Sequence, residues 1–276
     1  MTTGEISIFR MHCLYLLNIS THSDLPMARN NWQREELLIA FSLYCEIPFA
    51  QISARNPKII RAAEIIGRSP GALSMKLGNF GRLDPALQSR GVTGLSHGGR
   101  GEIDVWNEFN EKPEPLAIES EEARKKILSV PEQLDPELPE GPTDALRSVR
   151  VRMVQSFFRR TVLSGYNFTC CFCGLSISEM LIASHIIPWS VSVELRADPR
   201  NGIALCAFHD KAFDRGILSV DEAQRILVSG VISIPSDNQL ARVGLLELAN
   251  KPIKLADRFQ ADTTALSYHR TNIFKH

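Results

Sequence analysis

Two short segments of the chain bring together residue types that could support a hydrolytic reaction. The first, Ala183–Trp189, reads Ala-Ser-His-Ile-Ile-Pro-Trp, and the second, Asn201–His209, begins with an asparagine and ends with a histidine. An imidazole titrates near neutrality, so it can accept a proton, and it is also a common metal ligand. His185, Asn201 and His209 could thus supply the base and the metal ligand that a metal-dependent hydrolysis of phosphodiesters would need.

The flanking residues extend this pattern to a known family. Cys170–Gly174 (Cys-Cys-Phe-Cys-Gly) precedes the two segments, and Phe213–Gly216 (Phe-Asp-Arg-Gly) follows them. The whole stretch resembles the HNH endonucleases, whose catalytic unit is a β-hairpin and a helix around one metal ion. The resemblance implies that His185 is the general base, that Asn201 ties the loop together and orients the base, and that His209 is a metal ligand.

The second ligand of that ion differs from the family's pattern. In many relatives the residue before the base is an acid that binds the metal, but here it is Ser184. Asp210 and Asp214 are the nearest carboxylates, and four residues apart on a helix they share a face that His209 only partly overlaps. We expect Asp214 to be the second ligand in preference to Asp210. The implied ion is Mg²⁺, with Mn²⁺ as the alternative.

The cysteines raise the question of a structural metal. Cys170 and Cys173 form a Cys-x-x-Cys pair, and Cys206 lies three residues before His209. Such a set could hold Zn²⁺, as some HNH proteins do. If His209 serves the catalytic ion, only the cysteines remain, so we expect reduced thiols in preference to zinc. Because Cys13 and Cys45 stand alone, the sequence suggests no disulfide framework and a cytoplasmic location.

Local patterns predict how these residues are held. The apolar run around His185 predicts a strand, which would hold a base firmly. Asp198–Gly202 has the Pro, Asn and Gly of a tight turn, which we expect to join the strand to a helix that carries His209. Further on, strands are expected at 217–220 and 225–229 and a helix at 263–274.

A basic segment leads into this region. Composition alone describes an ordinary globular chain, because 44% of its 276 residues are hydrophobic and 31 basic residues balance 31 acidic ones. From 147 to 160, however, several arginines and no acids alternate with apolar residues at helical spacing. A basic helix face could bind phosphates, and a solvated face is the alternative. The candidate residues are Arg147, Arg150, Arg152, Arg159 and Arg160.

The N-terminal half is expected to be helical. Helices are predicted at 34–44, 57–66 and from Ser69-Pro70 through Asn79, with a Gly67-Arg68 turn between the second and third. The pair resembles a helix-turn-helix. If its second helix enters a major groove, Ser74, Lys76 and Asn79 would reach the bases. Plain helix packing is the alternative.

These patterns together predict an α+β protein. Four parts are expected: an uncertain N-terminal extension (1–26), a helical DNA-recognition domain (27–110), an acidic proline-rich linker (111–144) and a ββα-metal HNH nuclease domain (145–276). The extension is expected to be neither a signal peptide nor a membrane span, and the linker is expected to contain a short helix at 120–128. The resemblance implies a divalent-metal-dependent DNA endonuclease, and the two-module organisation suggests a restriction or defence role. The alternatives are a non-cleaving DNA-binding module with a zinc-stabilised hairpin and a nuclease that acts on RNA. The expected partner is double-stranded DNA without membrane contact, and a homodimer is left open.

Overall fold

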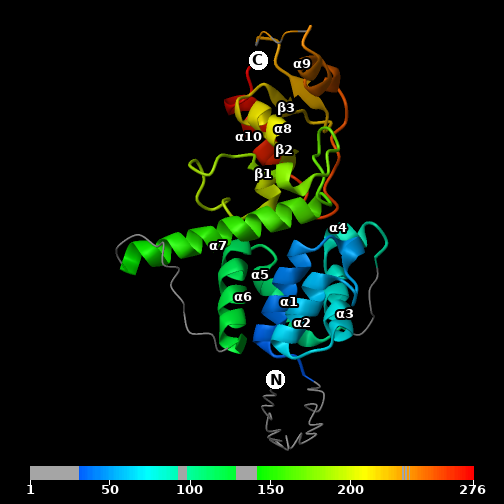
Figure 1. Ribbon diagram of the computed structural model, residues 1–276, viewed down its shortest axis with the longest axis vertical. Helices are drawn as coiled ribbons and strands as arrows, with labels where there is room; N and C mark the ends of the chain where they lie inside the picture. The colour runs from blue at the N-terminus through cyan, green and yellow to red at the C-terminus, as the bar shows by residue number, and fades with distance from the viewer. Residues whose placement is uncertain (1–30, 93–97, 129–141, 232, 234, 236) are drawn as a thin grey trace, which may run out of the picture. The chain divides into compact units, whose positions relative to one another are not determined.

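The computed structural model describes residues 31–92, 98–128, 142–231, 233, 235 and 237–276, with side chains in the long seventh helix described from residue 148 on. The architecture is α+β, with ten helices and two small antiparallel sheets in the described ranges (Figure 1). The helices are α1 Arg34–Glu46, α2 Pro57–Ile66, α3 Pro70–Gly81, α4 Pro85–Gln88, α5 Arg100–Phe109, α6 Pro113–Leu128, α7 Pro142–Gly165, α8 Ala207–Asp214, α9 Gln239–Gly244 and α10 Thr263–Asn272. The strands are β1 Leu181–His185, β2 Gly202–Cys206, β3 Leu218–Val220 and β4 Ile226–Val228. The expected extension 1–26 lies outside the described residues.

Local signals explain where α2 and α3 begin and end. The Asn56 side chain accepts a hydrogen bond from the Lys58 amide, and Ser69 accepts one from the Ala72 amide, so each helix starts with a cap followed by a proline. Gly67 ends α2 in the left-handed conformation, at φ 66°, where a side chain would be strained. The predicted helices are thus confirmed, whereas the helix-turn-helix role stays a prediction.

The helical half packs around α1. Every residue of α1 from Glu36 to Glu46 is buried, and α3, α5, α6 and α7 all contact it. Part of the predicted linker belongs to this layer, because α6 begins at Pro113 rather than Ser120 and buries Leu116 and Ala117 in the same core. The prolines of α6 lie in its first turn, where backbone amides have no partner within the helix, so they do not interrupt it. The apolar face of the helix can therefore pack in the core. Residues 129–141 lie outside the described residues.

Helix α7 contributes side chains to two hydrophobic cores. Phe157 packs in the core of the N-terminal helices, while its neighbour Phe158 packs in the core around β1 and β2. Figure 1 shows α7 passing between the N-terminal helices and the strands. The close approach explains Gly202, since a Cβ there would lie 2.5 Å from Val162 and 2.8 Å from the Phe158 ring. The hairpin is therefore held directly on this helix.

The remaining elements form the predicted hairpin-and-helix unit. Strand β1 pairs with β2, with His185 opposite Gly202, and α8 follows β2 and contacts both strands. The expected turn at 198–202 leads into β2 and not directly into the helix, which is a correction to the predicted connection. The predicted strands near 217–220 and 225–229 and the C-terminal helix are confirmed as β3, β4 and α10. Among the described helices, none has the length and apolar character needed to cross a membrane.

Candidate active site and metal centre

His185 ends strand β1 with its ring fixed on three sides. The ring stacks on Phe158 at a centroid distance of 3.9 Å and an interplanar angle of 6°, and Trp189 meets it edge-on at 5.6 Å. Its Nε2 lies 3.0 Å from the Arg196 carbonyl oxygen, which can only accept a hydrogen bond. The proton of a neutral His185 therefore sits on Nε2, and Nδ1 keeps a free lone pair. Burial lowers the pKa of His185, which favours this neutral form at neutral pH.

Asn201 holds the long loop between the two strands. Its amide oxygen accepts from the Ile187 backbone amide at 2.8 Å, and its nitrogen donates to the carbonyl oxygens of Ile187 at 3.0 Å and Leu195 at 3.3 Å. Leu195 is next to Arg196, whose carbonyl binds His185. The buried amide of Asn201 therefore holds the segment whose Arg196 carbonyl contacts the His185 ring.

A cleft of about 500 Å³ opens beside His185. Ser184, Asp210 and Asp214 line it together with Trp189 and His269. Both aspartates lie on α8, one helical turn apart, so their side chains share a face. Burial raises the pKa of Asp210, an effect that the Ser184 hydroxyl partly offsets. Burial and then the neighbouring Asp210 raise the pKa of Asp214.

These groups suit a hard divalent ion. Carboxylate oxygens are the ligands that Mg²⁺ and Mn²⁺ prefer, and a bound cation would relieve the repulsion between Asp210 and Asp214. Asp214 was expected as a ligand in preference to Asp210, but the structure brings both into the cleft of His185. Their i, i+4 spacing predicted that the two aspartates share one face of a helix. The spacing could not predict that this face of α8 points toward His185.

His209 does not line this cleft. It is buried, and its Nδ1 lies 3.2 Å from the Cys206 sulfur and 3.5 Å from the Cys170 sulfur. Its Nε2 lies 2.8 Å from the Gly244 carbonyl oxygen, so Nε2 carries the proton and the Nδ1 lone pair faces the sulfurs. A carbonyl that holds the far nitrogen in this way is typical of metal-binding histidines. His209 was expected to bind the catalytic ion, and the structure places it with the cysteines.

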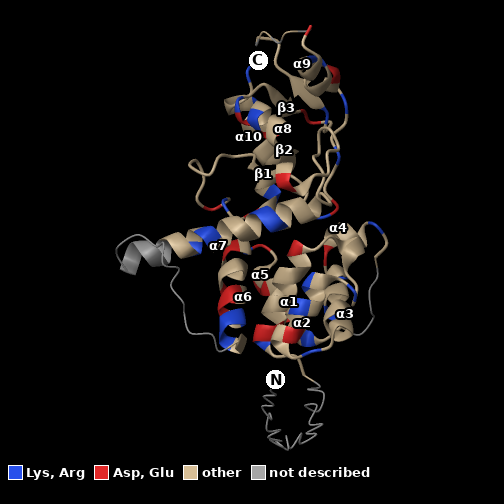
Figure 2. Cartoon of the chain, viewed as in Figure 1, with Lys and Arg blue, Asp and Glu red and all other residues tan. Residues whose placement is uncertain are grey.

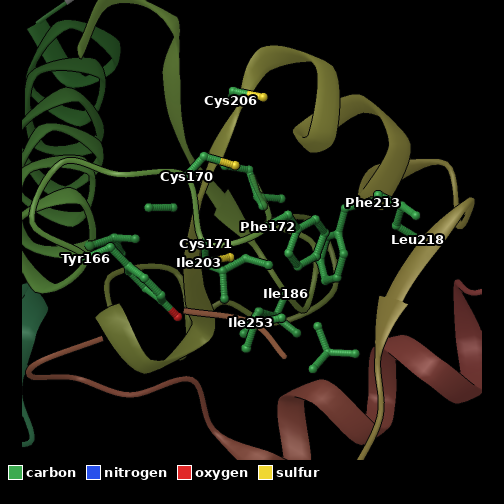
Figure 3. Close-up of a cluster of buried hydrophobic side chains, with 14 of the residues drawn as sticks. Tyr166, Cys170, Cys171, Phe172, Ile186, Ile203, Cys206, Phe213, Leu218 and Ile253 are labelled. Atoms are coloured by element: carbon green, nitrogen blue, oxygen red, sulfur yellow. The ribbon is translucent and has the colours of Figure 1, made fainter. Parts of the chain in front are cut away.

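Four side chains complete this second cluster. The possible ligand atoms of Cys170, Cys173, Cys206 and His209 all lie within 4.8 Å of one another, so the cluster could hold a metal ion. A hydrogen bond from Cys173 lowers the pKa of the Cys170 thiol to about 3, which favours a thiolate. The intervening Cys171 instead packs in the apolar core (Figure 3), and burial raises the pKa of its thiol.

Neighbouring positions on α8 therefore face different sites. Successive helical residues point about 100° apart. His209 reaches back to the Cys-x-x-Cys turn, while Asp210 faces the His185 cleft. The sequence argued against zinc because, with His209 assigned to the catalytic ion, only cysteines remained as ligands. In the structure the aspartates line the cleft, so His209 is available as the fourth ligand of the cysteine cluster.

The predicted basic face lies on α7. Arg150, Arg152 and Arg159 are exposed there, and Figure 2 shows blue segments, which mark Lys and Arg, along this helix. Arg160 forms an ion pair with Glu46 at 2.7 Å. The side chain of Arg147 lies outside the described residues. The first three arginines are the ones available to an anionic partner.

The polar residues expected to read bases on α3 have partners within the helical half. Lys76 forms an ion pair with the buried Glu102, and the Asn79 amide donates to the same carboxylate at 3.0 Å. Ser74 is half-buried. Sequence analysis missed Glu102, because nothing near it in the chain shows that it meets α3. A role of Lys76 or Asn79 in base reading, which would require release from Glu102, stays a prediction.

His269, on α10, is a structural residue at the edge of the cleft. Its Nε2 donates to the Phe213 carbonyl oxygen at 3.1 Å, its Nδ1 accepts from the Ser219 hydroxyl at 2.9 Å, and its ring stacks on Phe213 at 3.6 Å. Burial lowers the pKa of His269 to about 4. A histidine with both nitrogens engaged inside the protein cannot be a free base or ligand. These contacts hold α10 against β3 and the end of α8.

Comparison with known proteins places this unit in a family. No curated protein matches the chain. Residues 170–221 match the family model described as HNH endonuclease, and this stretch contains the Cys/His cluster, the β1–β2 hairpin, Asn201 and all of α8. Residues 170–221 are therefore similar to the HNH endonucleases.

Proposed function

We propose that the protein is a divalent-metal-dependent endonuclease that hydrolyses phosphodiester bonds of double-stranded DNA. The observation that carries the proposal is the cleft in which His185, with a free Nδ1, lies beside the carboxylates of Asp210 and Asp214. One group can take a proton and the other two can hold a cation, which are the requirements of the reaction.

Each residue has a distinct task in this proposal. Nδ1 of His185 takes a proton from water as the water oxygen attacks phosphorus and the bond to the leaving oxygen breaks. The lowered pKa of His185 keeps that nitrogen unprotonated at neutral pH. Asp210 and Asp214 would hold Mg²⁺ or Mn²⁺, which supplies charge neutralisation at the phosphate. Asn201 positions the base through the loop that ends at Arg196.

The second cluster is proposed to hold a structural Zn²⁺. Three sulfurs and one imidazole form a closed ligand set for zinc, and the Gly244 carbonyl fixes the required tautomer of His209. The site would tie the Cys170 turn to the start of α8. This proposal reverses the expectation of reduced thiols from the sequence, because His209 is no longer needed elsewhere.

DNA contact is proposed along α7. Arg150, Arg152 and Arg159 would bind backbone phosphates, which gives affinity without sequence preference. A restriction or defence role is proposed because the proposed nuclease unit occurs in the same chain as a separate layer of helices. The Cys/His cluster also suits the alternative function, a DNA-binding module whose zinc-stabilised hairpin does not cleave.

Cleavage assays separate these functions. Purified protein is incubated with modified duplex DNA, unmodified duplex DNA and RNA, with Mg²⁺ or with a chelator. We expect metal-dependent cleavage of duplex DNA, and a loss of about 10²- to 10⁴-fold in His185→Ala. His276→Ala, at an exposed terminal histidine, is the matched control and should cleave like the parent. DNA binding without cleavage would support the binding module, and cleavage of RNA alone would support an RNA nuclease.

A further inference from the structure

A second cavity, separate from the His185 cleft, lies among the N-terminal helices, α7 and the turn before β2. Its volume is about 540 Å³, within the range of small-molecule sites. Aromatic rings supply much of its wall, from Phe41, Trp106, Phe109, Phe157 and Phe259. Aromatic walls of this kind favour a flat ring, which can stack or pack edge-on against them.

One buried polar group in this cavity has no partner. Thr161, on α7, is completely buried, and its hydroxyl oxygen forms no hydrogen bond within the protein. Thr161 is also one of the residues that line the cavity. A buried hydroxyl without a partner destabilises a protein, because it has lost its hydrogen bonds to water. A ligand that hydrogen-bonds to Thr161 would remove this penalty.

The charges at the cavity disfavour an anionic ligand. Three carboxylates, from Asp84, Glu111 and Asp198, line it, against the single guanidinium of Arg200. That guanidinium already forms an ion pair with Asp198 at 2.8 Å. A phosphate would therefore meet net negative charge with no free cation among the lining residues. The same charges disfavour a base that enters while still attached to a DNA backbone.

We propose that this cavity binds an uncharged, flat heteroaromatic ligand the size of a free nucleobase or nucleoside. The ring packs against Trp106 and the phenylalanines, and a polar atom on its edge hydrogen-bonds to the Thr161 hydroxyl. The site is independent of the proposed nuclease chemistry, because none of its lining residues belongs to the His185 cleft.

Calorimetric titration of the full chain with adenosine and with cytidine tests the proposal. We expect one binding event per chain for at least one of the two nucleosides. Thr161→Val keeps the side-chain shape but removes the hydroxyl, so the affinity should fall about tenfold. Ser89→Trp should abolish binding, because Ser89 is an exposed lining residue and the indole would fill the cavity mouth.

Two controls make the test specific. Ser53→Trp adds the same indole at an exposed serine outside the cavity lining and should bind like the parent. Adenosine monophosphate should bind more weakly than adenosine, because its phosphate faces the lining acids. Thermal melts confirm folding of each variant, and Ser89→Trp alone decides the outcome if Thr161→Val does not fold.

Three results would overturn the proposal. The first is the absence of binding of both nucleosides to the parent chain at millimolar concentration. The second is unchanged binding in Ser89→Trp, which would place the ligand elsewhere. The third is tighter binding of the monophosphate than of adenosine, which would contradict the requirement for an uncharged ligand.

Discussion

The guanidinium of Arg258 donates a hydrogen bond to the backbone oxygen of Tyr44 at 2.7 Å and lies 4.5 Å from the centre of the Tyr44 ring. It also donates to the Ile47 oxygen at 2.6 Å, so a cation satisfies carbonyls at the C-terminal end of α1, where helices leave such oxygens unpaired. Arg258 is 1% exposed. A residue that follows the family-matched segment 170–221 thereby completes a helix of the N-terminal half.

We expect Arg258→Ala to lower the free energy of unfolding by about 3 kcal/mol, because hydrogen bonds to a charged group contribute more than neutral ones and the buried carbonyls would be left unpaired. Chemical denaturation measures the change. Arg215→Ala removes an exposed arginine and should leave stability within about 0.5 kcal/mol of the parent. Equal stability of the two variants would show that the Arg258 contact is not needed.

Asp210→Asn and Asp214→Asn should each raise the Mg²⁺ concentration needed for half-maximal cleavage by at least about tenfold, because an amide is a weaker ligand than a carboxylate for a hard cation. Cleavage is measured over a metal titration. Asp221→Asn, outside the cleft lining, is the matched control. Parent-like metal dependence of both cleft variants would remove these residues from the proposed ion site.

Purified protein should contain one Zn²⁺ per chain, and Cys170→Ser should lose it, because the set would keep only three of its four ligands. Elemental analysis measures the metal content, and a thermal melt should show lower stability after removal by a chelator. Cys45→Ser, at a buried cysteine outside the cluster, should retain the metal. Zinc that is absent from the parent, or that persists in Cys170→Ser, would contradict the site.

Stability should fall as the pH decreases from about 6.5 to about 4, because burial lowers the pKa of His269 from its usual 6.5 to about 4. Over this interval the unfolded chain binds a proton at His269 that the folded chain does not, which disfavours folding on the acidic side. The contribution of His269 is on the order of 3 kcal/mol between these limits. Denaturation of the parent and of His269→Gln at several pH values measures it, and His276→Gln is the control. An unchanged pH dependence in His269→Gln would refute this assignment.

Replacing Arg150, Arg152 and Arg159 with glutamine should weaken binding to duplex DNA of any sequence, because these side chains are proposed to bind phosphates. Each lost contact should reduce the slope of log affinity against log salt by about 0.9. Fluorescence anisotropy over a salt series measures both. Arg55→Gln, at an exposed arginine of the helical half, is the control. If the triple variant keeps the parent's salt slope, DNA does not bind along α7.

Much of the local structure could be predicted from the sequence. Asn56-Pro57 and Ser69-Pro70 start helices and Gly67 ends one, because caps, proline and left-handed glycine act within a single turn of chain. The apolar run at His185 likewise predicted a strand, and the residue order pointed to the HNH resemblance that implied the hairpin, whereas the turn ending at Gly202 was wrongly expected to lead directly into a helix.

Only the tertiary structure decided how the polar residues divide between two sites. His209 and Asp210 are adjacent in the chain, yet one faces the cysteines and the other the His185 cleft, and this direction depends on how α8 packs against β1 and β2. The carbonyl that selects the tautomer of His209 comes from Gly244, and the side chain that binds the backbone oxygen of Tyr44 comes from Arg258. The spacing of residues along the chain predicts contacts within a turn or a hairpin. Contacts between distant residues form only when whole helices and strands pack together, so a local sequence pattern cannot predict those contacts.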